Sequence, residues 1–175
     1  MTPSMHAFSV GTFRPLLRNL AGLLDAGADH VGEGEFAELA QARLAPDMLP
    51  LVSQVKLACD YANEACARLA ASAFEPSREI APSLEAMKAR IAETVAWLDL
   101  AAAAPLEAAA ERPISLPLRD ALVLETDGMG FLRDWSLPNF HFHVAMAYAI
   151  LRHRGAPLGK PDYMAHIGPS IRQAA

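Results

Sequence analysis

Four stretches of the chain carry apolar residues at three- and four-residue steps, and this spacing constrains the fold more than any other feature of the sequence. Residues three and four apart share one face of an α-helix, so each stretch predicts an amphipathic helix with an apolar face to bury. Four such helices can bury these faces against one another, which predicts an all-α four-helix bundle. The predicted helices run from Met5 to His30, from Asp47 to Leu69, from Ser83 to Ala104 and from Ser136 or Leu137 to Gly155.

Capping residues and prolines suggest where these helices begin. Pro15 lies inside the first stretch, where it predicts either a kink or a helix that starts at Pro15 itself. Asp47 is expected to cap the second helix, with Pro50 in its first turn, and Ser83 is expected to open the third. The connection before the second helix is expected to hold one short helical turn, from Phe36 to Gln41.

Between the third and fourth helices, from Arg112 to Leu137, the pattern changes. ISLPL and ALVLE are short β-prone runs, and TDGMG follows them. This pattern predicts a short hairpin or extended insert at one end of the bundle, with Asp127 and Gly128 forming a turn. At 175 residues, the chain is expected to fold as one domain, residues 1–175.

The charge and hydropathy of the chain exclude some classes of protein. Fifteen Lys and Arg stand against 20 Asp and Glu, and the net charge of −5 argues against a broadly basic nucleic-acid-binding protein. The longest strictly apolar run, Val144 to Leu151, is far shorter than the ~20 residues of a membrane-spanning helix. The first 20 residues do not resemble a signal peptide, because no basic leader precedes an apolar core. We therefore expect a cytoplasmic protein that does not bind membranes.

The two cysteines are expected to be structural. Cys59 and Cys66 are seven residues apart on the second helix, or about 10.5 Å along its axis at ~1.5 Å per residue. A disulfide needs α-carbons within about 7 Å, so the pair is interpreted as buried, small apolar residues.

The fourth helix places a histidine and an asparagine on one face. His143, Met146, Ile150 and His153 all lie within about 40° of Asn139 on a helical wheel, at ~100° per residue. Apolar residues flank this stripe, so the sequence predicts that Asn139 and His143 point together into the bundle. One interpretation is a hydrogen-bonded pair that fixes helix register, because buried polar groups need partners. The alternatives are a polar small-molecule pocket or a metal site, since positions i and i+4 can bind one ion.

Two motifs resemble those of a known family. The segments RLAPDMLPLVSQV and PNFHFHVAMAYAILRHRGAPLGKPD are similar to RLxPDMxPLxxQV and PNFxFHxxxAYAILRxxGxxLGKxD of a bacterial domain-of-unknown-function family. That family resembles the DinB/YfiT-like superfamily of four-helix bundles. In this superfamily a histidine on the second helix and an HxxxH motif on the last helix bind a divalent ion. The resemblance implies the same fold over nearly the whole chain, with relatives that include thiol-dependent transferases and an isomerase.

This chain departs from the superfamily's ligand set. By the resemblance, His143 stands where the second histidine of HxxxH would fall, and Asn139 stands at the first. The second helix has no histidine, and Gln54 is its nearest polar candidate. Because amide oxygens are poor ligands for nickel or zinc, His143 is the best remaining candidate metal ligand.

Two hypotheses of function follow. In the first, the protein binds a small molecule or interacts with a partner through a semi-polar pocket near Asn139, His143 and Gln54, after loss of the metal triad. In the second, it is a transferase or isomerase that depends on a divalent metal (nickel, zinc or iron) or on a thiol cofactor, with His143 as ligand or general base. The sequence assigns no catalytic residue. Relatives associate through helices, so we also expect a homodimer.

Overall fold

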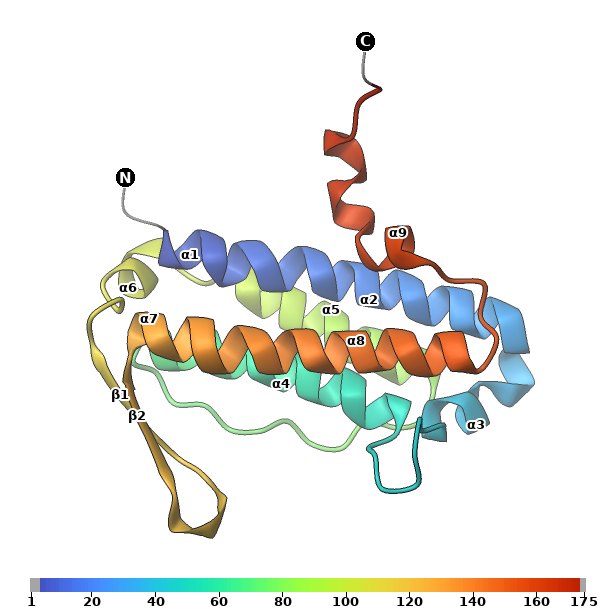
Figure 1. Ribbon diagram of the computed structural model, residues 1–175, viewed down its shortest axis with the longest axis horizontal. Coiled ribbons are helices and arrows are strands. Elements are labelled where there is room, and N and C mark those ends of the chain that lie inside the picture. The colour runs from blue at the N-terminus through green and yellow to red at the C-terminus, as the bar shows by residue number, and fades with distance from the viewer. Residues whose placement is uncertain (1–3, 174–175) are drawn as a thin grey trace.

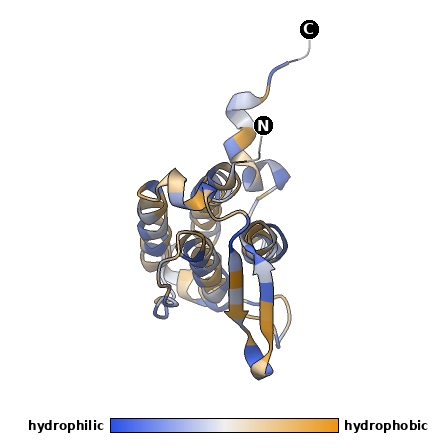
Figure 2. Cartoon of the chain, turned by 90° about the vertical axis from the view of Figure 1, so that its left-hand side faces the viewer, coloured by the Kyte–Doolittle hydropathy of each residue, from blue (hydrophilic) through white to orange (hydrophobic). Residues whose placement is uncertain are grey.

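Four helices of 16 to 22 residues form the body of the protein. The computed structural model describes residues 4–173, and in this part of the chain the four are α2 (Val10–Val31), α4 (Leu51–Leu69), α5 (Leu84–Asp99) and α8 (Leu137–His153). Both α2 and α4 pack against α5 and against α8, so the four helices lie side by side around one core (Figure 1, Figure 2). The chain is mostly helical, and a small two-stranded sheet extends from one end of this body.

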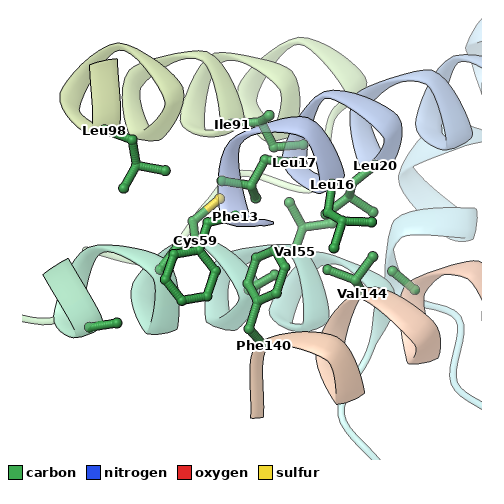
Figure 3. Packing of buried hydrophobic residues seen from close by; sticks show 14 of the residues in the cluster. Phe13, Leu16, Leu17, Leu20, Val55, Cys59, Ile91, Leu98, Phe140 and Val144 are labelled. Carbon is green, nitrogen blue, oxygen red and sulfur yellow. The ribbon is translucent and has the colours of Figure 1, made fainter. Parts of the chain in front are cut away.

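The core is built from apolar side chains of all four long helices (Figure 3). Phe13 of α2 and Phe140 of α8 meet edge to face, with ring centroids 4.8 Å apart and an interplanar angle of 68°. Both rings are fully buried, and this geometry suits the charge distribution of aromatic rings. Around them lie Leu17 and Leu20 of α2, Val55 and Cys59 of α4, Ile91 and Leu98 of α5, and Val144 of α8.

The first predicted helix is divided near its start. A short helix, α1 (Met5–Phe8), is separated from α2 by Ser9, whose backbone is not helical. The helix α2 continues through Pro15, so the alternative in which the helix begins at Pro15 is wrong. The proline removes one backbone donor, but burial of the apolar face on both sides of it holds the helix together. At its start, α1 is tied to α6 (Ala103–Glu107), because Glu107 accepts hydrogen bonds from the first backbone N–H groups of α1.

The predicted caps of the second and third helices have different outcomes. Asp47 lies in a turn and does not cap α4; the residue before the helix is Pro50, which makes no side-chain capping bond. A capping side chain must directly precede the first helical residue, and Asp47 is too far from Leu51 to do so. The predicted role of Ser83 is confirmed, because its hydroxyl accepts a hydrogen bond from the backbone N–H of Ala86 at 3.2 Å.

The insert between the third and fourth long helices is a hairpin, as predicted. Strands β1 (Pro113–Pro117) and β2 (Val123–Asp127) pair antiparallel, with Ser115 opposite Glu125. The Ser115 hydroxyl donates to the Glu125 carboxylate across the ladder at 2.7 Å. Between the strands, Asp120 adopts a positive φ of 57°, which a short aspartate side chain tolerates better than most.

The hairpin ends earlier, and the fourth helix begins earlier, than the sequence predicts. Asp127 caps a helix that starts with α7 (Gly128–Gly130), and its carboxylate accepts from the N–H of Gly130 at 2.6 Å. A π-helical segment, Phe131–Ser136, joins α7 to α8 without a break. The predicted start at Ser136 or Leu137 and the interpretation of Asp127 as a turn residue are therefore wrong. The aspartate supplies the acceptor that the first N–H groups of the helix need.

The connections and the C-terminal segment complete the fold. The short helix α3 (Phe36–Gln41) coincides with the predicted turn. Gly155 ends α8 with a positive φ of 94°, as predicted. Beyond it, α9 (Lys160–Tyr163) is held to α2 by Asn19, whose side-chain amide donates to the carbonyl of Tyr163 at 3.0 Å. The 3₁₀ segment Ala165–Ser170 then projects away from the body (Figure 1).

None of the helices described here combines the length and the apolar character that crossing a membrane would require.

Candidate functional site

The buried face of α8 is rotated from the one that the sequence predicts. Its fully buried residues are Phe140, Val144, Ala147, Ile150 and Leu151, joined by His143 at 7% exposure. Of the apolar residues expected to flank the core-facing stripe, Phe140, Ala147 and Leu151 on one side are its centre, whereas Phe142 on the other side is 52% exposed. As a consequence, Asn139 and Met146 are half-buried at the edge of this face, and His153 is exposed.

His143 meets Gln54 between α8 and α4. The imidazole Nδ1 and the Gln54 Oε1 are 2.7 Å apart, and Gln54 is only 2% exposed. The other end of the Gln54 amide is fixed as well, because its Nε2 donates to the carbonyl of Leu49 at 3.1 Å. A reversed amide would set oxygen against oxygen at Leu49, so Oε1 is the atom that faces the imidazole. Nδ1 of His143 must then carry the proton and donate it.

Two aromatic rings hold the imidazole in place. Tyr61 of α4 stacks on it almost in parallel, with ring centroids 5.4 Å apart, and Phe142 packs edge to face at 5.3 Å. Burial lowers the pKa of His143 from its ordinary 6.5 to about 4, so the ring is neutral at pH 7.

The second ring nitrogen of His143 is free to accept a hydrogen bond. Among the described residues Nε2 has no hydrogen-bond partner. Some polar atoms without a partner are fully buried in this structure, and the Ser136 hydroxyl is one of them. Nε2 of His143 is not one of them, so part of this atom is exposed. The site thus presents one oriented acceptor atom.

Asn139 does not join this arrangement. Its side-chain amide donates to the backbone carbonyl of Trp135, one turn earlier in the same helix, at 2.8 Å. Of the three residues predicted to share a pocket, the structure brings Gln54 and His143 into contact. The Asn139 side chain instead makes a hydrogen bond within its own helix. The reason is the rotation of α8, which puts Asn139 at the edge of the buried face.

Tyr61 also lines a pocket of about 240 Å³. It is formed by α4, by the connection after α4, by the end of β1 and by Trp135. Sequence reasoning missed all three aromatic residues of this pocket, Tyr61, Phe74 and Trp135. A signal for Tyr61 existed, because it lies seven residues after Gln54 and therefore two helical turns away on the same face. For Trp135 there was none, since the sequence placed this residue outside the helix.

The residues present do not fit the divalent metal of the superfamily. No cluster of three His, Cys, Asp or Glu side chains with metal-binding proximity occurs in the part of the chain that the structure describes. His143 is one imidazole, and the amides of Asn139 and Gln54 are engaged in hydrogen bonds as described above. Nickel and zinc prefer imidazole and thiolate ligands, and this donor set supplies a single one.

The cysteines add no ligand to this site. Cys59 and Cys66 are both free and buried in the core, and burial raises the pKa of each thiol to about 12. A thiol with so high a pKa is neither a nucleophile nor a good metal ligand at neutral pH.

Comparison with known proteins agrees with this fold. A crystal structure of a DinB family member protein from Shewanella denitrificans is similar to 91% of this chain and to 90% of that chain, with 30% sequence identity and a TM-score of 0.77. None of the curated proteins matches. The model of the family described as "Domain of unknown function (DUF1993)" matches residues 5–164. The chain therefore belongs to the DUF1993 family, a domain of unknown function with a DinB-like fold.

Proposed function

We propose that this protein binds a small molecule, without a metal, at a site centred on His143, and that the four long helices serve as a DinB-type four-helix bundle that holds this site in shape. The observation that carries the proposal is the chain of hydrogen bonds from Leu49 through Gln54 to His143. It fixes the tautomer of the ring and leaves Nε2 as an oriented acceptor. The ligand would carry a hydroxyl or N–H group that donates to Nε2.

The low basicity of His143 favours binding over proton transfer. A general base works best when its pKa lies near the working pH. The pKa of His143, about 4, lies well below neutrality because the ring is buried. At pH 7 such a ring accepts a hydrogen bond but removes a proton poorly, so a ligand held by its donor group suits the site better than an acid–base reaction.

The experiment is a fragment screen by nuclear magnetic resonance on the full chain, with the ¹⁵N signal of His143 Nε2 as the reporter. Phenol and imidazole serve as probes with an O–H or N–H donor, and anisole serves as the matched probe without one. We expect the donors to shift the Nε2 signal in a saturable way and anisole to leave it unchanged. A chelator should not alter the result.

The matched control is the neighbouring histidine on the same helix. His141→Gln should retain binding, because His141 is only half-buried and lies outside the bonded chain from Leu49 to His143. His143→Gln should abolish it. Stoichiometric nickel, zinc or iron retained by the wild-type protein through gel filtration would instead favour the metal-dependent transferase or isomerase.

We also propose, from the resemblance to proteins that associate through helices, that the chain forms a cytoplasmic homodimer. Light scattering coupled to gel filtration measures its mass, and a value near the 18.8 kDa of one chain at micromolar concentration would contradict the dimer.

A further inference from the structure

The C-terminal segment is tied to the four long helices through a single side chain. We call residues 164–173 the C-terminal arm; its 3₁₀ turn, Ala165–Ser170, is exposed at every residue and projects away from the body (Figure 1). Asn19 of α2 contacts the chain on both sides of the start of this arm. Its side-chain Nδ2 lies 3.0 Å from the carbonyl oxygen of Tyr163 and 2.7 Å from Nδ1 of His166.

The first of these contacts fixes the orientation of the Asn19 amide. Nδ2 donates one hydrogen to the carbonyl of Tyr163, and a reversed amide would set oxygen against oxygen there. The other hydrogen of Nδ2 is left for Nδ1 of His166, which must therefore accept it and carry no proton. The docked arm thus requires the neutral imidazole with its proton on Nε2.

Protonation of His166 breaks this arrangement. The imidazolium carries a hydrogen on both ring nitrogens, so an N–H of Asn19 would face an N–H of His166. Rotating the Asn19 amide would offer its oxygen to the imidazolium, but the amide would then lose the bond to Tyr163. One asparagine cannot satisfy both partners once the histidine is charged.

The charged groups around His166 do not compensate for this loss. The ionisable side chains of the elements beside it are Arg14, Arg18, Asp25, Asp29 and His30 of α2, Tyr148 of α8, Lys160, Asp162 and Tyr163 of α9, and Arg172 of the arm. Asp25 pairs with Lys88 of α5, and Asp162 accepts from the N–H of Gly159. In the part of the chain that the structure describes, no carboxylate forms an ion pair with His166.

We propose that the C-terminal arm is docked on α2 by neutral His166 and is released when His166 is protonated. Histidine side chains in general change charge between pH 5 and 8, so the change falls within the physiological range. The arm, rather than α9, leaves the body, because Tyr163 is half-buried and its ring packs against Tyr148, whereas His166 is exposed. With little burial to oppose release, one hydrogen bond decides the docking. This inference goes beyond the proposed function and does not depend on it.

The test measures the mobility of the arm in the full-length protein at pH 7.5 and pH 5.5. The ¹⁵N{¹H} nuclear Overhauser effect of the backbone at Ile167, Gly168 and Ile171 reports motion in nanoseconds or faster. We expect values of a rigid backbone at pH 7.5 and of a flexible chain at pH 5.5, with the docked population about tenfold lower in the protonated form. The backbone of Val144, in the core of α8, should stay rigid at both pH values.

Two variants assign the effect to the contact between His166 and Asn19. His166→Gln removes the group that changes charge, so the mobility of the arm should no longer depend on pH. Asn19→Asp should reverse the dependence, because a carboxylate accepts from the imidazolium and holds the arm better at pH 5.5 than at pH 7.5. The matched control is His153→Gln, an exposed histidine of α8, which should behave as the wild type does.

Three results would overturn the proposal. The first is a wild-type arm with the same mobility at both pH values, whether rigid or flexible. The second is a pH dependence that persists in His166→Gln. The third is an Asn19→Asp protein whose arm still becomes more mobile as the pH falls.

Discussion

At the scale of single residues, the decisive feature is the amide of Gln54. Its nitrogen is held by the carbonyl of Leu49 and its oxygen faces the imidazole of His143, so one side chain sets the protonation pattern of another. A metal-binding histidine usually has its tautomer fixed by a partner in the same way. Here the partner comes from α4, the helix on which the resemblance implies a histidine ligand.

The buried neutral ring of His143 makes stability depend on pH. The pKa of this histidine is about 4 in the folded protein and near 6.5 in the unfolded chain, so in this window the unfolded chain binds more protons. The free energy of unfolding should therefore be highest above pH 6.5 and fall as the pH drops to 4. We expect a total loss of about 2 kcal/mol over this window. A fully buried ring would lose ~1.4 kcal/mol for each pH unit of the window, but part of this ring meets solvent, so the loss is smaller.

Urea unfolding at pH 7 and pH 4.5 measures this dependence. His143→Phe should flatten it, although this variant is less stable at pH 7 because Gln54 loses its donor. Half-burial also lowers the pKa of His141, so a smaller dependence of the same sign should remain. An unchanged slope in His143→Phe would contradict the assignment.

Replacing the Gln54 amide by a carboxylate should raise the pKa of His143, which burial lowers. In Gln54→Glu a negative charge would face Nδ1 of His143 at the present 2.7 Å, and an opposite charge at this distance favours the imidazolium. The pKa of His143 should rise by about 1–3 units in a titration followed by nuclear magnetic resonance. Gln54→Met, which has no charge, should leave the pKa low. A low pKa in both variants would show that the two side chains do not meet in solution.

At the scale of elements, the fourth helix depends on the cap at Asp127. The Asp127 carboxylate accepts a hydrogen bond from the N–H of Gly130 at 2.6 Å, and it thereby caps the helical segment that contains Trp135. Asp127→Ala should lower the free energy of unfolding by about 0.5–2 kcal/mol. The control is Asp134→Ala, since the exposed Asp134 pairs with the exposed Arg133 beside it and its removal should change stability far less than loss of the cap. Equal effects of the two variants in urea unfolding would contradict the cap.

Two glycines in helices should respond to alanine with opposite signs. A β-carbon on Gly128 would lie 2.0 Å from the backbone carbonyl oxygen of Ala109, which cannot swing away as a side-chain end can. Gly128→Ala should therefore cost about 1–3 kcal/mol or more. Gly22, inside α2, has nothing within 4 Å of the position that a β-carbon would take, so Gly22→Ala should stabilise the protein by about 0.4–1 kcal/mol. Thermal unfolding separates the two outcomes.

At the scale of the whole molecule, the two cysteines report on global unfolding. Both thiols are buried in the core, and burial raises the pKa of each to about 12. A thiol-specific reagent such as dithionitrobenzoate should label neither in the folded protein at pH 7.5 and both in urea. Rapid labelling of the folded protein would mean that the α4 face opens locally, against the packing described here.

How well the sequence predicts a feature depends on how far apart in the chain the interacting residues are. The four long helices, the hairpin, the Ser83 cap and the Gly155 stop depend on neighbours within a few residues, and the sequence indicates them directly. The start of the fourth helix was missed because a glycine-containing TDGMG segment resembles a turn until an aspartate and a packed partner make it helical.

The sequence alone therefore indicated the four long helices, the hairpin and the burial of His143, because apolar periodicity is a local property, but it missed the helical turns from Gly128 to Ser136. Only the tertiary structure decided which polar residue meets that histidine. Asn139, four residues away on the same helix, donates to the backbone carbonyl of Trp135. The partner of His143 is Gln54, which lies on another helix and 89 residues away in the chain. The rotation of α8 made this choice, and that rotation is set by how large apolar side chains from four helices fit together.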